Sequence, residues 1–264
     1  KVSFSLDPNM DYSVSLGITP KNYSPEEILN LPEQIAAKMD IHIVVCIDEF
    51  QQIGEWADSL TIQKRMRSVW QHQQHTSYCL FGSKKHLLAN LFQNRRMPFY
   101  HFGDTIFLKP ISTSDWIPFI CGKFAEKGKK ISEELVGKIC TTVASHSSYV
   151  QQLAWNIMVN TETEVTDEIF QQSISELLAQ CSPLFIQQIQ GLTTYQMNLI
   201  RCLCQGVRKD FTSKDVLETY QLGSKSNISR LKKTLVEKEI IEEEGDTITL
   251  ADPIFELWFK REYM

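Results

Sequence analysis

Short apolar runs alternate with longer amphipathic stretches along the first part of the chain. The apolar runs at 41–47, 78–81 and 105–108 have the length and continuous hydrophobicity of buried parallel strands. The stretches between them show helical spacing, and Ser24-Pro25-Glu26-Glu27 combines a capping serine, a proline at the first helical position and two acids. Strands that alternate with helices predict an α/β fold built on a parallel sheet.

The helices of this first part are predicted at 24–39, from the first strand through Gln74, and from Lys84 to about Gln93. At the start of the chain, polar and apolar residues alternate in two runs on either side of Asp7-Pro8-Asn9, which predicts a β-hairpin over residues 1–20.

The pattern changes after Ser112 to helices without a convincing strand. These helices are predicted at 115–128, 132–144, 149–160 and 166–180. Beyond Pro183 and Gly191, three further helices are predicted at 193–205, 212–220 and 224–239. They lead into two short strands around a Glu-Gly-Asp turn at 240–250, which is the order of a winged helix-turn-helix. The expected domains are therefore an α/β unit at 1–111, an all-α unit at 112–190 and a winged helix at 191–264.

Composition narrows the class of protein. The net charge of -5 argues against a chain that coats nucleic acid over its whole surface, although a local basic face remains compatible with it. The seven cysteines are odd in number, include no Cys-x-x-Cys pair and mostly sit in apolar runs, as expected for reduced core thiols of a cytoplasmic protein. No apolar stretch reaches the ~20 residues that a membrane span needs. Because the chain opens on Lys1, we expect it to be part of a longer protein.

Two acids follow the first predicted strand, in the run Ile43-Val44-Val45-Cys46-Ile47-Asp48-Glu49-Phe50. Carboxylates at the carboxyl edge of a parallel sheet lie where ligands of open α/β folds bind. In a P-loop ATPase the first acid of such a Walker B pattern, here Asp48, helps to hold Mg²⁺, and the second, here Glu49, polarises the attacking water. The alternative is a strand that ends in two solvated acids.

A second polar pair follows the next strand. Gly82-Ser83, with Lys84 beyond, is expected at the same edge, where a hydroxyl and a cation could meet a γ-phosphate. The alternative is an ordinary strand-to-helix turn in which Ser83 caps the helix.

Together these segments resemble the STAND branch of the AAA+ ATPases, and in particular a prokaryotic family described as archaeal-type ATPases. The matching segments are Ile47–Gln51, Ser77–Ser83, Pro98–Tyr100, Tyr149–Ala154 and Asp252–Trp258, in this order along almost the whole chain. The resemblance implies an ATP- and Mg²⁺-dependent protein with Asp48 as the magnesium-side acid, Glu49 as the base and Ser83 as the sensor. It also implies a partial P-loop ATPase core at 1–111 and a helical lid at 112–190, with Arg95, Arg96 and Tyr149 toward the nucleotide and Lys84 beside Ser83.

The sequence departs from that family in two places. The phosphate loop Gly-x-x-x-x-Gly-Lys-Ser/Thr does not occur, and we expect it upstream of Lys1. The lid segment that usually reads Gly-His-Pro-Tyr is Ser145-His146-Ser147-Ser148 here, which puts an adenine contact from the lid in doubt.

Several other residues have a structural interpretation that competes with a functional one. Arg95 and Arg96 could supply an arginine finger or form a solvated basic helix end. His72 and His75 could hold a metal, but no carboxylate or cysteine lies beside them in sequence. Trp155 and Trp258 occupy apolar helical positions and are predicted to be core residues rather than ligand stackers.

The third helix of the predicted winged helix carries the candidate partner-binding residues. Its buried face is predicted from Ile228, Leu231 and Leu235. The residues expected to reach DNA phosphates or base edges are Lys225, Asn227, Ser229, Arg230, Lys232 and Lys233. The glutamates at 242–244 would repel DNA, so a protein partner for this domain remains the alternative.

We therefore expect an ATP-binding, slowly hydrolysing STAND-type switch whose nucleotide, bound between core and lid, repositions the winged helix. The alternative is a non-catalytic scaffold that binds DNA or a protein and retains only the ATPase fold.

Overall fold

The structure, a computed structural model, describes residues 23–264 and divides the chain into two compact units. Unit 1 ends at Phe107, and unit 2 runs from Leu108 to Met264. The hairpin predicted for residues 1–20 lies outside the described residues. No helix within residues 23–264 is long and apolar enough to cross a membrane.

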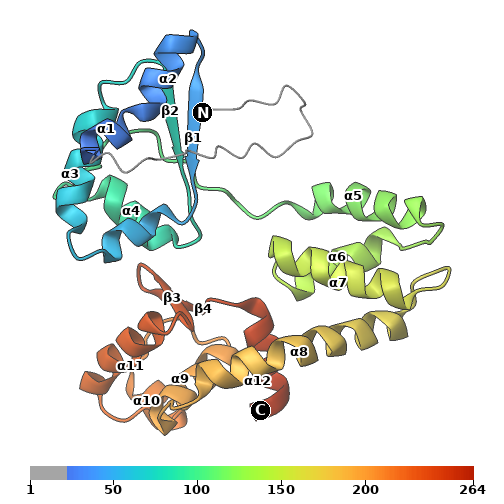
Figure 1. Ribbon diagram of the computed structural model, residues 1–264. Helices are drawn as coiled ribbons and strands as arrows, with labels where there is room; N and C mark the ends of the chain where they lie inside the picture. The colour runs from blue at the N-terminus through green and yellow to red at the C-terminus, as the bar shows by residue number, and fades with distance from the viewer. Residues whose placement is uncertain (1–22) are drawn as a thin grey trace. The chain divides into compact units, whose positions relative to one another are not determined.

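Unit 1 is built on two parallel strands, β1 (Ile43–Ile47) and β2 (Thr76–Leu80), which pair in register from Ile43 with Thr76 to Ile47 with Leu80. The helices of this unit are α1 (Pro25–Leu29), α2 (Leu31–Met39), α3 (Ser59–Trp70), α4 (Lys85–Gln93) and the 3-10 helix η1 (Phe50–Glu55) (Figure 1). The prediction that the first two strands are parallel neighbours is confirmed.

Aromatic side chains form the core of unit 1. Phe50 and Phe99 are buried and meet edge to face with ring centroids 5.4 Å apart. Trp70, at the end of α3, stacks on Tyr78 of β2 with ring centroids 4.0 Å apart. Because Phe50 directly follows Glu49, this packing fixes the chain immediately after the two acids.

Two helix predictions for unit 1 need correction. The helix predicted at 24–39 is divided into α1 and α2 at Asn30, which is the C-cap of the first and the N-cap of the second. The long helix predicted after β1 is η1 followed by α3, separated by Trp56–Asp58. Proline favours the first turn of a helix, and Pro32 stands in the first turn of α2, where a new helix can start.

The third strand, predicted at 105–108, is also wrong. Residues 104–112 have no regular secondary structure. Ile106 and Leu108 are 81% and 92% exposed, so this apolar run packs against no sheet. It lies where the two units divide, and a short apolar run cannot by itself distinguish such a connection from a strand.

Unit 2 begins with four helices, α5 (Thr113–Glu126), α6 (Glu133–Thr142), α7 (Ser147–Asn160) and α8 (Asp167–Ile189). It continues with α9 (Thr194–Cys204), α10 (Lys214–Thr219), α11 (Lys225–Glu237), the antiparallel strands β3 (Ile241–Glu244) and β4 (Thr247–Leu250), and α12 (Pro253–Tyr263) (Figure 1). Except for the end of α8, and for α12, for which no range was predicted, the helices after Ser112 and the two-stranded wing occur where the sequence predicted them.

One hydrophobic core runs through all of unit 2, from Trp116 of α5 to Phe259 of α12. Helix α8 connects its two ends, because it continues through Pro183 to Ile189 rather than stopping before that proline as predicted. Trp258 is 2% exposed, as expected of a core residue, whereas Trp155 on α7 is 60% exposed, so the prediction that it is core was wrong.

Candidate nucleotide-binding site

The two acids leave β1 at the carboxyl edge of the sheet, next to the end of β2. Two backbone bonds join the strands there: Phe81 N donates to Ile47 O at 3.1 Å, and Phe50 N donates to Phe81 O at 3.0 Å. Between these bonds the chain turns sharply, with Glu49 in the left-handed region at φ 49°. The turn brings the side chain of Glu49 over the segment that follows β2.

Glu49 and Ser83 meet directly, as the sequence predicted. The Ser83 hydroxyl lies 3.0 Å from Glu49 Oε1 and 3.2 Å from Oε2, and it donates a hydrogen bond to the carboxylate. The Gln51 side-chain amide donates a further hydrogen bond to Glu49 Oε2. Asp48 is exposed beside them, and its Oδ1 accepts from Glu49 N at 2.7 Å.

These contacts keep the Glu49 carboxylate ionised. Hydrogen bonds from Gln51 and Ser83, together with the positive charge of Lys84, hold the pKa of Glu49 below its ordinary value. Such a carboxylate can orient a water molecule and accept a proton as one leaves it, but it is a weaker base than an ordinary glutamate.

Gly82 and Gln51 form a support that sequence reasoning missed. Gln51 is only 2% exposed. A Cβ on Gly82 would lie 1.9 Å from Gln51 Oε1 and 3.3 Å from Glu49 Cα, so any larger residue there would displace the Gln51 side chain that contacts Glu49. A glutamine two residues after the Asp-Glu pair was the available sequence signal for this role.

The donor set fits magnesium held largely through water. Asp48 offers an exposed carboxylate and Ser83 an exposed hydroxyl at the same edge, and hard oxygen ligands are the ones that Mg²⁺ prefers. The described residues contain no group of three or more His, Cys, Asp or Glu that could enclose a metal ion. His75 is instead held by Glu33, with Nδ1 and Oε1 2.9 Å apart.

The remaining nucleotide candidates divide into those near the acids and those elsewhere. Lys84 stands at the N-cap of α4 and acts electrostatically on Glu49. Arg95 and Arg96 are exposed in the turn after α4 and, among the described residues, make no hydrogen bond or ion pair with Asp48, Glu49 or Ser83. Their arginine-finger role stays a prediction.

Tyr149 is engaged within unit 2. Its hydroxyl donates to Asp252 Oδ2 at 2.5 Å, across 103 positions in sequence. The other carboxylate oxygen of Asp252 accepts from the backbone N–H groups of Ile254 and Phe255, which caps α12. Burial and the negative charge of Asp252 raise the pKa of Tyr149. The bond therefore ties helix α7 to the start of α12.

Replacing Tyr149 by phenylalanine should therefore destabilise unit 2 by about 1–3 kcal/mol, because a charged acceptor loses its partly buried donor. Urea unfolding followed by circular dichroism measures this loss. Tyr220→Phe is the matched control, since its hydroxyl bonds only the neutral side chain of Gln205. A Tyr149→Phe variant with unchanged stability and weakened ATP binding would contradict this structural role and indicate that Tyr149 contacts the nucleotide.

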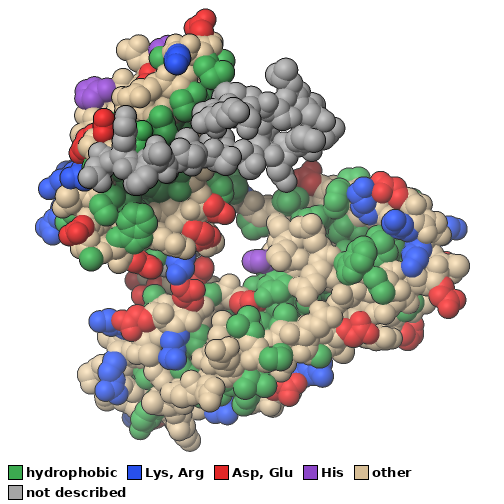
Figure 2. Space-filling model, in the orientation of Figure 1, with side chains coloured by type: hydrophobic (Ala, Val, Ile, Leu, Met, Phe, Trp, Pro, Cys, Tyr) green, Lys and Arg blue, Asp and Glu red, His purple; other side chains and the backbone are tan. Residues whose placement is uncertain are grey.

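The candidate DNA-binding residues lie on α11, although not all are available. Lys225, Ser229, Arg230 and Lys233 are exposed. Lys232 is turned back to the domain, 5.1 Å from the ring of Phe211 and 3.9 Å from Glu243. Figure 2 shows Lys and Arg side chains over α10 and α11, with acidic side chains among them.

Comparison with known proteins agrees with this architecture. Residues 183–261 match the family described as "Probable winged helix domain". Among solved structures, the Walker-type ATPase PABY2304 of Pyrococcus abyssi superposes with a TM-score of 0.71 at 16% identity, covering 94% of this chain and 72% of that one.

Two other solved structures are similar at a lower level. The ORC2 protein of Aeropyrum pernix gives a TM-score of 0.46 at 11% identity, with 94% and 72% coverage. Cdc6p of Pyrobaculum aerophilum gives 0.42 at 15% identity, with 94% and 74% coverage. None of the curated proteins matches the chain significantly.

The chain thus has the fold of a P-loop ATPase followed by a C-terminal winged helix. Of these three solved structures, the Walker-type ATPase of Pyrococcus abyssi is the one with a TM-score above 0.5.

Proposed function

We propose that this protein is a STAND-type ATPase in which bound nucleotide acts as a regulatory switch. The observation that carries the proposal is the cluster at the sheet edge, where the Ser83 hydroxyl lies 3.0 Å from a carboxylate oxygen of Glu49 and Asp48 stands beside it. The likeness to a Walker-type ATPase supports the fold on which this cluster is placed.

Each residue of the cluster has a chemical role in this proposal. Asp48 helps to hold the hydrated magnesium of Mg·ATP, which neutralises charge on the phosphates when bound. Glu49 orients the attacking water and accepts its proton. The Ser83 hydroxyl donates to Glu49 and can rotate to donate to a γ-phosphate instead. Gln51 holds the Glu49 carboxylate from the other side.

The winged helix is the proposed output of the switch. It shares one hydrophobic core with the lid helices, and the Tyr149–Asp252 bond joins the two parts. A change transmitted to the lid would therefore carry the winged helix with it, because a close-packed core does not deform continuously.

Hydrogen exchange on the full-length protein tests the switch. We expect the backbone amides of α8 and α12 to exchange at different rates in two states: ATP bound to the hydrolysis-deficient variant Glu49→Gln, and ADP bound to the wild type. Asp48→Asn should abolish the magnesium-dependent part of the difference, because a neutral amide holds hydrated magnesium less well. Identical protection in the two nucleotide states would rule out the switch while leaving ATP hydrolysis possible.

We also propose that the exposed side of α11 contacts duplex DNA. The observation that favours this second function is the basic character of that side, where Lys225, Arg230 and Lys233 are all exposed. Such contacts act mainly on phosphates and weaken with added salt. Glu243 pairs with Lys232, so Glu243→Lys should strengthen DNA binding by removing a negative charge near the duplex.

A further inference from the structure

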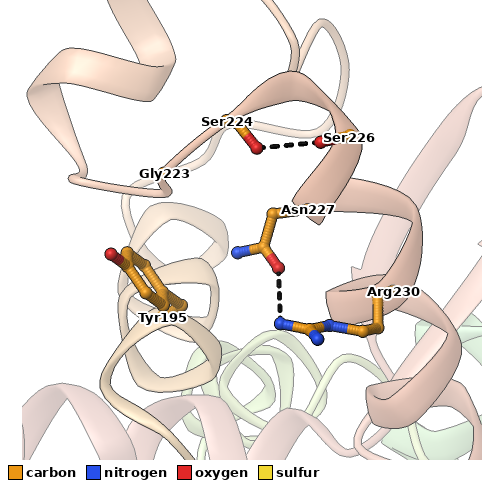
Figure 3. A pocket seen from close by; sticks show the side chains of 6 residues that line it. All are labelled: Tyr195, Gly223, Ser224, Ser226, Asn227 and Arg230. Carbon is orange, nitrogen blue, oxygen red and sulfur yellow. Dashed lines mark hydrogen bonds between the residues drawn. The ribbon is translucent and has the colours of Figure 1, made fainter.

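A solvent-open cavity lies between the starts of α9 and α11. It has a volume of about 430 Å³ and is lined by Tyr195, Gly223, Ser224, Ser226, Asn227 and Arg230. Figure 3 shows the Tyr195 ring on one side of it, the Asn227 amide and Arg230 guanidinium on the other, and the two serines at its upper end. Tyr195 comes from α9, whereas the other four side chains come from α11 and its N-cap.

The lining offers hydrogen-bond donors and one positive charge, but no negative charge. It contains a guanidinium, three hydroxyls and an amide, and none of the six residues is acidic. Arg230 donates to Asn227 Oδ1 at 3.0 Å, which fixes the guanidinium and leaves further N–H groups for a ligand. Asn227 is held in turn by Leu222 O, to which its Nδ2 donates at 3.3 Å. The positive charge is therefore pre-positioned at the cavity.

The backbone before α11 lies close to the ring of Tyr195 on α9. Gly223 has φ +80°, and a Cβ there would lie 3.3 Å from Tyr195 Cε1. Glycine thus lets the turn before α11 pass close to the ring. Ser224, although it is the N-cap, does not cap the helix with its side chain, and its hydroxyl instead lies 2.9 Å from that of Ser226. Both hydroxyls are exposed and can rotate to a ligand.

We propose that this cavity seats one phosphodiester of duplex DNA, with Arg230 supplying the charge and Tyr195 and Ser226 supplying neutral hydrogen bonds. The inference rests on the proposed DNA contact of α11 and adds to it a residue of another helix, Tyr195. The oxygen atoms of a phosphodiester can accept hydrogen bonds from the guanidinium and from the hydroxyls at the same time. Because the cavity is open to solvent, the DNA backbone can enter it on one side and leave it on the other.

The test measures the affinity of the full-length protein for a random-sequence duplex at several salt concentrations by fluorescence anisotropy. Arg230→Gln should reduce the slope of log affinity against log salt by about 0.9, because one phosphate contact is lost. Tyr195→Phe should weaken binding about threefold to tenfold without changing the slope, because the phenol is uncharged. The double variant should be less than additive, since both groups act on the same phosphate.

Matched controls separate the cavity from general effects. Lys123→Gln removes a charge on α5, and Tyr263→Phe removes a phenol on α12; neither residue lines the cavity, and both variants should behave as wild type. Tyr195 is 47% exposed and Arg230 is exposed, so melting temperatures should stay unchanged.

Three results would overturn the proposal in distinguishable ways. Absence of wild-type duplex binding at low salt would reject the DNA contact of α11 itself. Binding that is weakened by Lys233→Ala but unaffected by Arg230→Gln and Tyr195→Phe would leave the DNA contact standing and reject the cavity. The third result concerns inorganic phosphate, titrated at constant ionic strength. If phosphate raises the melting temperature of the wild type but not of Arg230→Gln, and no duplex binds, the cavity is assigned to a free anion instead.

Discussion

Replacing Glu49 by glutamine is expected to leave ATP bound and to slow phosphate release by about a hundredfold or more, the usual contribution of a general base. The variant preserves the shape of the side chain, and Ser83 can still donate to the remaining carbonyl oxygen, so the site should stay assembled. What it loses is the proton acceptor for the attacking water.

The measurement is single-turnover phosphate release by the full-length protein, with ATP affinity determined in parallel. Glu55→Gln, an exposed glutamate on η1, is the matched control and should leave both quantities unchanged. Because the pKa of Glu49 is held below its ordinary value, the wild-type rate should be flat around neutral pH and fall only on the acid side. A rate that Glu49→Gln does not alter would remove the catalytic role from this residue.

Replacing Trp258 by alanine is expected to destabilise unit 2 by about 3–5 kcal/mol. The indole is 2% exposed, and its ring centroid lies 5.4 Å from that of Phe185 and 5.7 Å from that of Phe255. Its Nε1 also donates to Ser182 Oγ at 3.0 Å. Alanine would leave a cavity where α12 meets α8 and an unpaired serine.

Trp155→Ala is the matched control, because that tryptophan on α7 is 60% exposed and its loss should cost less than about 0.5 kcal/mol. Urea unfolding by far-ultraviolet circular dichroism gives both values. Equal, small losses of stability in the two variants would contradict a single hydrophobic core that joins helices α5–α8 to the winged helix.

The sequence was most informative about local pattern. Short apolar runs followed by Asp48-Glu49 and by Gly82-Ser83 predicted two parallel strands with their polar ends together, and the structure has both, although no residue of β1 is buried. The same rule failed at 105–108, because an apolar run predicts burial but does not show what will cover it, and Ile106 and Leu108 are exposed.

Long-range contacts were out of reach of sequence reasoning. Nothing near Tyr149 indicates that its partner is Asp252, and the spacing of Lys232 suits an outward-facing residue until the wing places Glu243 beside it. Gln51 follows the two acids closely in sequence, but its role depends on how closely Gly82 approaches after the neighbouring strand. Such pairs are set by tertiary packing rather than by periodicity.

The central claim is that the edge formed by Asp48, Glu49 and Ser83 serves Mg·ATP, and calorimetric titration of the full-length protein tests it most directly. We predict saturable binding of Mg·ATP that loses its magnesium-dependent part in Asp48→Asn, because a neutral amide holds hydrated magnesium less well than a carboxylate does. Protein that binds no Mg·ATP, or whose Asp48→Asn variant keeps the wild-type dependence of ATP binding on magnesium, would contradict the claim.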